Sequence, residues 1–219
     1  MNWGRRLLEN WRTGGRSRVR RVIVLGFNGL KPALVDHFLE QDLLHYSALL
    51  SDIGTRADWV DSWTLDVARL ASAIGKFGVR TVALPSPHLS SPADMQAICA
   101  ADRLQQERLI AALKRSRPGL VACDFDMPAQ LARLFGPDPD DSERLVIRDV
   151  YARMDEIVGK AYSFVDDRTV LLAAIPSPTT AEVADGLLFA SCPPDAVGRP
   201  ESSLEATVLR LLGVAPRDA

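Results

Sequence analysis

Short runs of β-branched and other apolar residues recur along this chain, and longer segments with helical periodicity separate them. The runs are RVIVLG (21–26), VRTVALP (79–85), LVACDF (120–125), TVLLAAI (169–175) and GLLFASC (186–192). Runs this short and this apolar are typical of strands buried on both faces of a parallel sheet. The alternation therefore favours an α/β fold, with a mainly parallel sheet of four to five strands and helices on both of its faces.

The segments between these runs carry apolar residues at helical spacing. We expect helices over residues 32–50, 65–77, 93–115, 142–164 and 203–213. Pro32 opens the first helix and Gly78 follows the second, as the conformational preferences of these two residues favour. Asp138, Asp140 and Asp141 precede the segment 142–164, where acidic residues cap a helix and suit its dipole.

The bulk composition is that of one globular domain. The chain has 219 residues, of which 47% are hydrophobic and 25% charged, and a net charge of -2 gives it no overall attraction to nucleic acid. Cys99, Cys123 and Cys192 are odd in number and scattered, so we expect reduced thiols rather than a disulfide framework. No apolar run is long enough to span a membrane or to serve as a secretory signal, so we expect a cytoplasmic location.

Positive charge is concentrated at the N-terminus, where residues 1–21 hold seven arginines and one acid, Glu9. We divide the chain into a basic and aromatic N-terminal arm (1–19) and a single α/β domain (20–219). The arm is either a solvated tail or a docking element for a protein partner, with membrane contact at most peripheral. Its candidate docking residues are aromatic, aliphatic or basic: Trp3, Arg5, Arg6, Leu7, Trp11 and Arg12.

The order of these elements, and the sequences at their ends, resembles the alkaline phosphatase superfamily, in particular its type I phosphodiesterase/nucleotide pyrophosphatase group. The resemblance covers most of residues 20–214. It is carried by RVIVLGFNGLKPALVDHFLEQDLLHYSALLSDIGT, DVARLASAIGKFGVRTVALPSP, DVYARMDEIVGKAYSFVDDRTVLLAA, GLLFASCPP and SLEATVLRLLGV. It implies a shortened form of that family's core. In the family, Asp and His side chains hold two divalent metals, which activate a Ser or Thr nucleophile.

The chain departs from the family pattern at the positions that carry this chemistry. Asn28 stands where the family has its first-strand Asp, and Ala174 to Ser177 stand where it has Ser-Asp-His-Gly. The family's Asp-x-x-x-His falls on Met127 to Leu131 or, shifted by one residue, on Asp126 and Gln130. Trp59 to Trp63 runs directly into the next expected helix, so the nucleophile loop is expected to be deleted, and nearby Thr64 lacks the surrounding motif.

Three polar residues remain at the expected strand ends, and we name them the vestigial cleft: Asn28, Asp124 and Asp126. Asp124 and Asp126 are expected to share one face at the carboxyl end of a strand, where α/β sheets place ligand sites. They could hold one divalent cation; the alternative is a polar strand end that faces solvent.

The three histidines do not complete a metal site in the sequence. His37 and His45 lie eight residues apart on one expected helix, which is not metal-ligand spacing, and we expect both to be structural or solvated. His88 lies in a loop and could touch a ligand, and no histidine follows it as the family's late metal ligand. No motif of another enzyme class takes the place of the missing residues.

We therefore expect a pseudoenzyme with no catalytic residues, no metal and no cofactor, which acts as a scaffold or accessory subunit of a larger protein assembly. One alternative is a ligand or nucleotide sensor that uses the ancestral cleft. Another is a metal-dependent phosphodiesterase or other hydrolase with an altered site around Asn28, Asp124 and Asp126. No nucleic-acid partner is expected. The rich use of Arg, Ala and Asp is typical of high-GC bacterial genomes.

Overall fold

The computed structural model describes residues 19–59, 66–87, 89, 94–115, 119–176, 186–193, 197 and 203–214. The strands are β1 (Arg21–Phe27), β2 (Thr55–Trp59), β3 (Thr81–Leu84), β4 (Gly119–Phe125), β5 (Thr169–Ile175) and β6 (Gly186–Ala190). The helices are α2 (Pro32–Glu40), α3 (His45–Ile53), α4 (Val67–Gly75), α5 (Met95–Arg115), α6 (Met127–Phe135), α7 (Asp141–Tyr162) and α9 (Leu204–Leu211). The predicted α/β class is confirmed.

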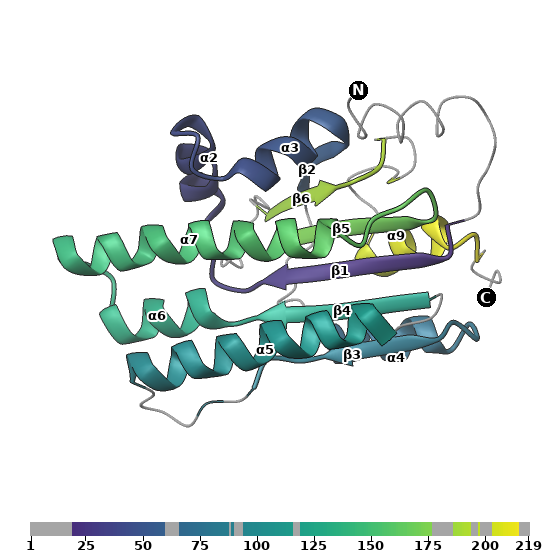
Figure 1. Cartoon of the computed structure of the whole chain (residues 1–219), viewed down its shortest axis with the longest axis horizontal. Coiled ribbons are helices and arrows are strands. Elements are labelled where there is room, and N and C mark those ends of the chain that lie inside the picture. The colour runs from purple at the N-terminus through teal and green to yellow at the C-terminus, as the bar shows by residue number, and fades with distance from the viewer. Residues whose placement is uncertain are drawn as a thin grey trace.

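The six strands form one sheet in the order β2-β6-β5-β1-β4-β3. Strand β6 runs antiparallel to both of its neighbours, β2 and β5, whereas the other paired strands are parallel. Figure 1 shows α5, α6 and α7 in front of the sheet and α4 and α9 behind it. The sheet is therefore mainly parallel and is covered on both faces, as the sequence predicts.

Alternate residues of the central strand β1 point into two separate apolar cores. Ile23 and Leu25 pack into the core beneath α2, α3, α5, α6 and α7. Val22 and Val24 pack into the core shared with α4 and α9. All four side chains are fully buried, and each contributes about 1.5–3 kcal/mol relative to an exposed position. This two-sided burial explains why the strand reads as a continuous apolar run.

Two elements were missing from the sequence prediction. Strand β2 has the sequence TRADW, which contains two charged residues and no apolar run, and it lies at the edge of the sheet. Helix α6 is short and follows β4 after a single residue; Pro128 in its first turn and Gly136 at its C-cap (φ 79°) mark its two ends. The sheet thus has six strands, one more than the upper end of the expected range.

The single helix expected over residues 32–50 is two helices. Helix α2 ends at Glu40, and Asp42 takes a left-handed backbone conformation (φ 58°) that turns the chain. Helix α3 then begins at His45, where α7 supplies its cap: the backbone N–H groups of Tyr46 and Ser47 donate to the Asp155 carboxylate at 2.9 and 2.7 Å. The split into two helices has a tertiary cause, because the capping residue Asp155 lies more than a hundred residues away in the sequence.

Helices α5 and α7 are joined at two places. Near the middle of α5, the buried Asp102 carboxylate forms an ion pair with Arg153 of α7 at 2.8 Å. At the second place, Arg21 of β1 donates to the carbonyl of Leu113 in α5 at 3.2 Å and to that of Phe164, just beyond α7, at 2.9 Å. These contacts fix the two helices side by side over the sheet.

Candidate functional site

The vestigial cleft lies where three parallel strands end. Strands β1, β4 and β3 are adjacent, and the register pairs Gly26 with Asp124 and Leu84 with Cys123. The residues that follow these strands therefore meet at one edge of the sheet, which is where open α/β sheets place their ligand sites. Asn28, Asp124 and Asp126 lie at this edge, and hydrogen bonds connect them to the neighbouring loops.

Asn28 and Asp126 are bonded directly to each other. The side-chain Nδ2 of Asn28 donates to Oδ1 of Asp126 at 2.7 Å. The backbone of Asn28 is also fixed, since its N–H donates to the Phe125 carbonyl at 3.0 Å and its carbonyl accepts from Ala129 at 3.2 Å. Asn28 is only 8% exposed, and its buried Oδ1 has no hydrogen-bond partner among the described residues. The amide thus ties the end of β1 to the start of α6.

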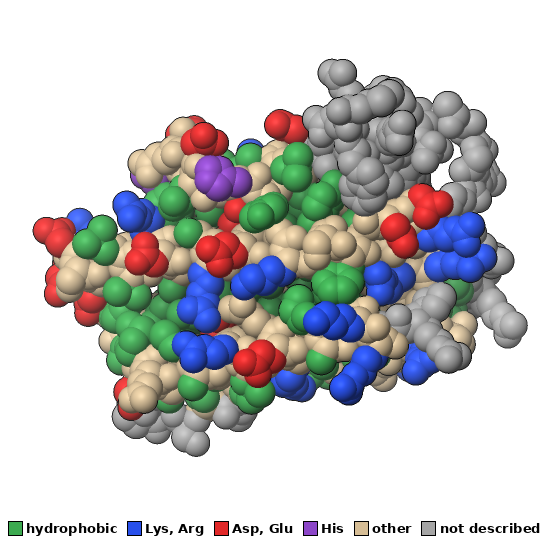
Figure 2. All heavy atoms as spheres, viewed as in Figure 1, with side chains coloured by type: hydrophobic (Ala, Val, Ile, Leu, Met, Phe, Trp, Pro, Cys, Tyr) green, Lys and Arg blue, Asp and Glu red, His purple; other side chains and the backbone are tan. Residues whose placement is uncertain are grey.

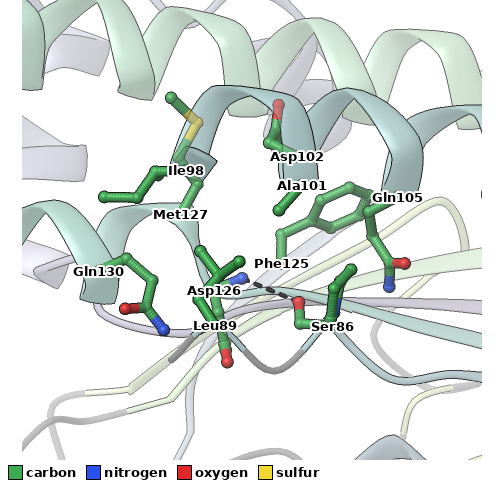
Figure 3. Close-up of a pocket in the computed structure, with 11 residues that line it drawn as sticks. Ser86, Leu89, Ile98, Ala101, Asp102, Gln105, Phe125, Asp126, Met127 and Gln130 are labelled. Atoms are coloured by element: carbon green, nitrogen blue, oxygen red, sulfur yellow. Dashed lines mark hydrogen bonds between the residues drawn. The ribbon is translucent and has the colours of Figure 1, made fainter. Parts of the chain in front are cut away.

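Ser86, which follows β3, links the two aspartates. Its backbone N–H donates to Oδ1 of Asp124, and its hydroxyl donates to the Asp124 carbonyl at 2.9 Å. The same hydroxyl accepts from the backbone N–H of Asp126 at 3.1 Å, the contact drawn in Figure 3. Sequence reasoning missed Ser86, because only the register between β3 and β4 places it beside these residues.

Asp124 and Asp126 do not share a strand face, which corrects the sequence prediction. Strand β4 ends at Phe125, and Asp126 has a helical backbone conformation as the N-cap position of α6. The alternation of side chains between the two faces of the strand therefore ends before Asp126, and the two carboxylates do not lie on one face. The Asp124 carboxylate meets the loop after β3, while the Asp126 carboxylate meets the loop after β1.

Burial raises the pKa of Asp124 to about 6, and the negative charge of nearby Asp126 adds to this effect. The backbone N–H of Ser86 acts in the opposite direction, because a hydrogen bond to the carboxylate favours its charged form. The Asp124 carboxylate can therefore take up a proton near pH 6.

Gln105 of α5 fixes the backbone beside Asp124. Its Nε2 donates to the Asp124 carbonyl at 2.9 Å and to the Leu84 carbonyl at 2.6 Å.

A small pocket lies beside the cleft, between α5 and α6. Figure 3 shows Ser86, Asp126 and Gln130 along one side of it and Ile98, Ala101 and Phe125 along the other. The predicted pair of Asp126 and Gln130 thus faces one pocket, in the positions that the resemblance assigns to Asp-x-x-x-His. The pocket combines a polar margin with an apolar wall, as small-molecule sites commonly do.

The residues present do not fit the two-metal set that the resemblance implies. Among the residues described, no three His, Cys, Asp or Glu side chains lie close enough to hold a metal together. One Asp126 oxygen accepts from an amide and one Asp124 oxygen accepts from a backbone N–H, so both carboxylates are engaged with the protein. Asn28 contributes a neutral amide oxygen, which does not offset the charge of a cation.

The histidines lie away from this edge where they can be placed. His37 is exposed on α2 beside Gln41 (3.0 Å between their side-chain nitrogens), and His45 is exposed at the start of α3. His88 falls outside the described residues, and so do Thr64 and the six docking residues of the N-terminal arm, Trp3, Arg5, Arg6, Leu7, Trp11 and Arg12. None of the described helices is both long enough and apolar enough to cross a membrane.

Comparison with known proteins adds a likeness of fold. The solved structures that resemble this chain include one of a 2-O GAG sulfatase (TM-score 0.55, 10% identity) and one of a putative sulfatase from Bacteroides thetaiotaomicron (TM-score 0.55, 11% identity). Each match covers 91% of this chain and 72% of the other. The fold is sulfatase-like. No family model matches the sequence, and no curated protein matches it.

Sulfatases have an alkaline-phosphatase-like fold, so this chain shares its fold with proteins of that kind. At 10–11% identity the likeness concerns the fold alone. The similar structures are of enzymes or a putative enzyme, and what the present chain does has to be argued from its own residues.

Proposed function

We propose that this chain is a degenerate, non-catalytic member of the alkaline phosphatase superfamily that serves in the cytoplasm as an accessory subunit of a larger protein assembly. The observation that carries the proposal is the hydrogen bond between Asn28 and Asp126. It joins two positions that would face a metal in the family, and it uses a neutral donor where the family has a carboxylate.

The surrounding contacts support the same proposal. The Asp124 carboxylate accepts from the Ser86 N–H, and the Ser86 hydroxyl bridges the Asp124 carbonyl and the Asp126 N–H. A reacting group that entered here would have to displace these bonds, and a buried group left without its partner costs about 1–3 kcal/mol. A site arranged for catalysis would instead present its donors and acceptors to the substrate.

A backbone contact closes the cleft further. Gly29 has a left-handed conformation (φ 87°), and a Cβ built there would lie 2.5 Å from the Cα of Ala129. Helix α6 therefore packs directly against the turn after β1. This close approach keeps Asn28 and Asp126 together, and it supports a structural role for the pair.

Activity measurements test the non-catalytic part of this proposal. The full chain is incubated with Zn²⁺, Mn²⁺ or Mg²⁺ and an activated phosphodiester, and in parallel with an activated aryl sulfate. We expect no turnover above that of the Asn28→Ala and Asp126→Ala variants. Metal-dependent turnover that is lost in Asp126→Ala would contradict the proposal and identify a hydrolase.

A second candidate is a ligand-binding or hydrolytic site that uses the same edge in an altered form. Two observations favour it: the buried Asn28 Oδ1 has no partner within the described part of the chain, and the pocket beside Asp126 has a polar margin formed by Ser86 and Gln130. A thermal-shift screen with nucleotides and sulfate or phosphate esters addresses it, because a ligand that binds only the native state raises the Tm. A shift that is lost in Gln130→Ala would favour a sensor over a subunit without a ligand.

A further inference from the structure

A shallow groove crosses the outer surface of the molecule between α5 and α7. We call it the basic groove and define it by Ile110, Ala111, Lys114, Arg115 and Lys160. Figure 2 views this face and shows Lys and Arg side chains gathered along the two helices, with acidic side chains interspersed. The chain as a whole has a net charge of -2, so this concentration of positive charge is local.

The three cations of the basic groove are not used within the described part of the fold. No ion pair joins Lys114, Arg115 or Lys160 to a carboxylate of any described residue. Lys160 donates only to the neutral amide oxygen of Gln106, at 3.1 Å. Their charges are therefore available to a ligand.

The ordinary explanation for basic residues here is compensation of the helix dipoles, since Lys114 and Arg115 lie in the last turn of α5. Arg21 provides part of this compensation from inside the molecule, because its guanidinium donates to the carbonyl of Leu113 in the last turn of α5 and to that of Phe164, just beyond the end of α7. Lys114, Arg115 and Lys160 lie on the outer surface instead, and their side chains are exposed to solvent.

We propose that the basic groove binds an acidic segment of a partner polypeptide, with one apolar side chain of that segment seated on Ile110 and Ala111. The proposal deepens the proposed role as an accessory subunit and rests on it. The partly buried Ile110 and Ala111 give the groove an apolar floor, and the cations stand around it. Positive charge around an apolar contact favours a ligand in which acidic residues flank an aliphatic one.

The surroundings favour a short polypeptide over nucleic acid. Glu107 lines the groove itself, and Glu156 is exposed on α7 one turn from Lys160. Farther along α7, the exposed Asp138 and Asp141 mark the start of the helix. A nucleic acid needs a continuous basic track for its evenly spaced phosphates, and these carboxylates interrupt it.

An array of 12-residue peptides that combine Glu or Asp with Leu, Ile or Val at varied spacings provides the test. The labelled full chain is compared with the variant Lys114→Glu/Lys160→Glu. The matched control, Lys76→Glu/Arg133→Glu, makes the same change in net charge at exposed sites on α6 and beyond the end of α4. Circular dichroism and Tm confirm that each variant is folded.

We expect the wild-type chain and the control to bind a subset of these peptides, and the groove variant to bind them about tenfold more weakly or worse. Replacement of the acids in those peptides by Gln or Asn should abolish binding. An array without binding, equal binding by the groove variant, or preference for an oligonucleotide of equal charge would overturn the proposal. Separate measurements test the subunit role itself. Metal-dependent turnover, or a native mass equal to that of the chain alone, would contradict that role whatever the peptide array shows.

Discussion

The side-chain amide of Asn28 donates to the carboxylate of Asp126 at 2.7 Å, across the ends of β1 and the loop after β4. Both residues lie at the carboxyl edge of the sheet, where open α/β sheets place their ligand sites. Here the two side chains are directed toward each other. The bond is the reason for treating this edge as structural, and it can be tested by changing its donor.

Replacing Asn28 with Asp should destabilise the fold at neutral pH. The change places a second carboxylate against Asp126 in a site that is only 8% exposed, and like charges in such a site repel each other. We expect a loss of about 2 kcal/mol in the free energy of unfolding, measured by urea denaturation. Asn28→Ala is the control and should lose less; an Asp variant as stable as wild type would show that the bond does not hold this edge together.

The raised pKa of Asp124, about 6, predicts a specific pH dependence. Between pH 4 and 6 the folded state holds this proton more often than the unfolded state, so the free energy of unfolding contributed by Asp124 falls as pH rises through 6. Asp124→Asn stays neutral and should therefore gain stability relative to wild type as pH rises from 4 to 7. Urea denaturation at several pH values measures the difference; parallel curves for the two proteins would contradict the raised pKa.

Asp155 should be one of the most important polar residues for stability. Its carboxylate accepts from the N–H groups of Tyr46 and Ser47 and from the Ser47 hydroxyl, at 2.9, 2.7 and 2.6 Å, and so caps α3 from α7. We expect Asp155→Ala to cost about 3 kcal/mol. Asp149→Ala on the exposed side of the same helix serves as the control, with a change within about 0.5 kcal/mol. Equal losses in the two variants would refute the capping role.

Gly29 and Gly136 form a matched pair for testing the close approach of α6. Both have positive φ (87° and 79°), but a Cβ at Gly29 would strike Ala129, whereas one at Gly136 meets nothing within 4 Å. Gly136→Ala should cost only the backbone strain of its conformation (φ 79°, ψ -167°), about 1–3 kcal/mol. Gly29→Ala should cost about 1–3 kcal/mol more than this, because the clash with Ala129 adds to the strain, and thermal unfolding resolves the two. Similar Tm values for both variants would mean that the contact with α6 is not tight.

The sequence was a good guide wherever burial alone decides the structure. Strands β1, β4 and β5 are covered on both faces, so their apolar runs could be recognised without any knowledge of the fold. Asp140 also follows its local signal, since it caps α7 in a capping box with Glu143, as the acidic turn predicts. In these cases the structure is decided either by apolar burial, which has no preferred direction, or by hydrogen bonds between residues only a few positions apart in the sequence.

The sequence was a poor guide where a distant residue decides the structure. The division of residues 32–50 into α2 and α3 has no Gly or Pro to announce it, because the cap of α3 comes from Asp155. Strand β2 exists because β6 pairs with it, although TRADW has no strand-like pattern. The same holds at the vestigial cleft, where Ser86 is brought beside Asp124 only by strand register.

The native mass of the tagged protein in its source cells tests the proposed role most directly, with mass spectrometry of whatever travels with it. The account predicts a particle well above the 24.0 kDa of the chain, with partners present in stoichiometric amounts. Deleting residues 1–18 and reversing the charge of the basic groove would then separate the contributions of the arm and of α5 and α7. A protein that migrates alone near 24.0 kDa would contradict the account.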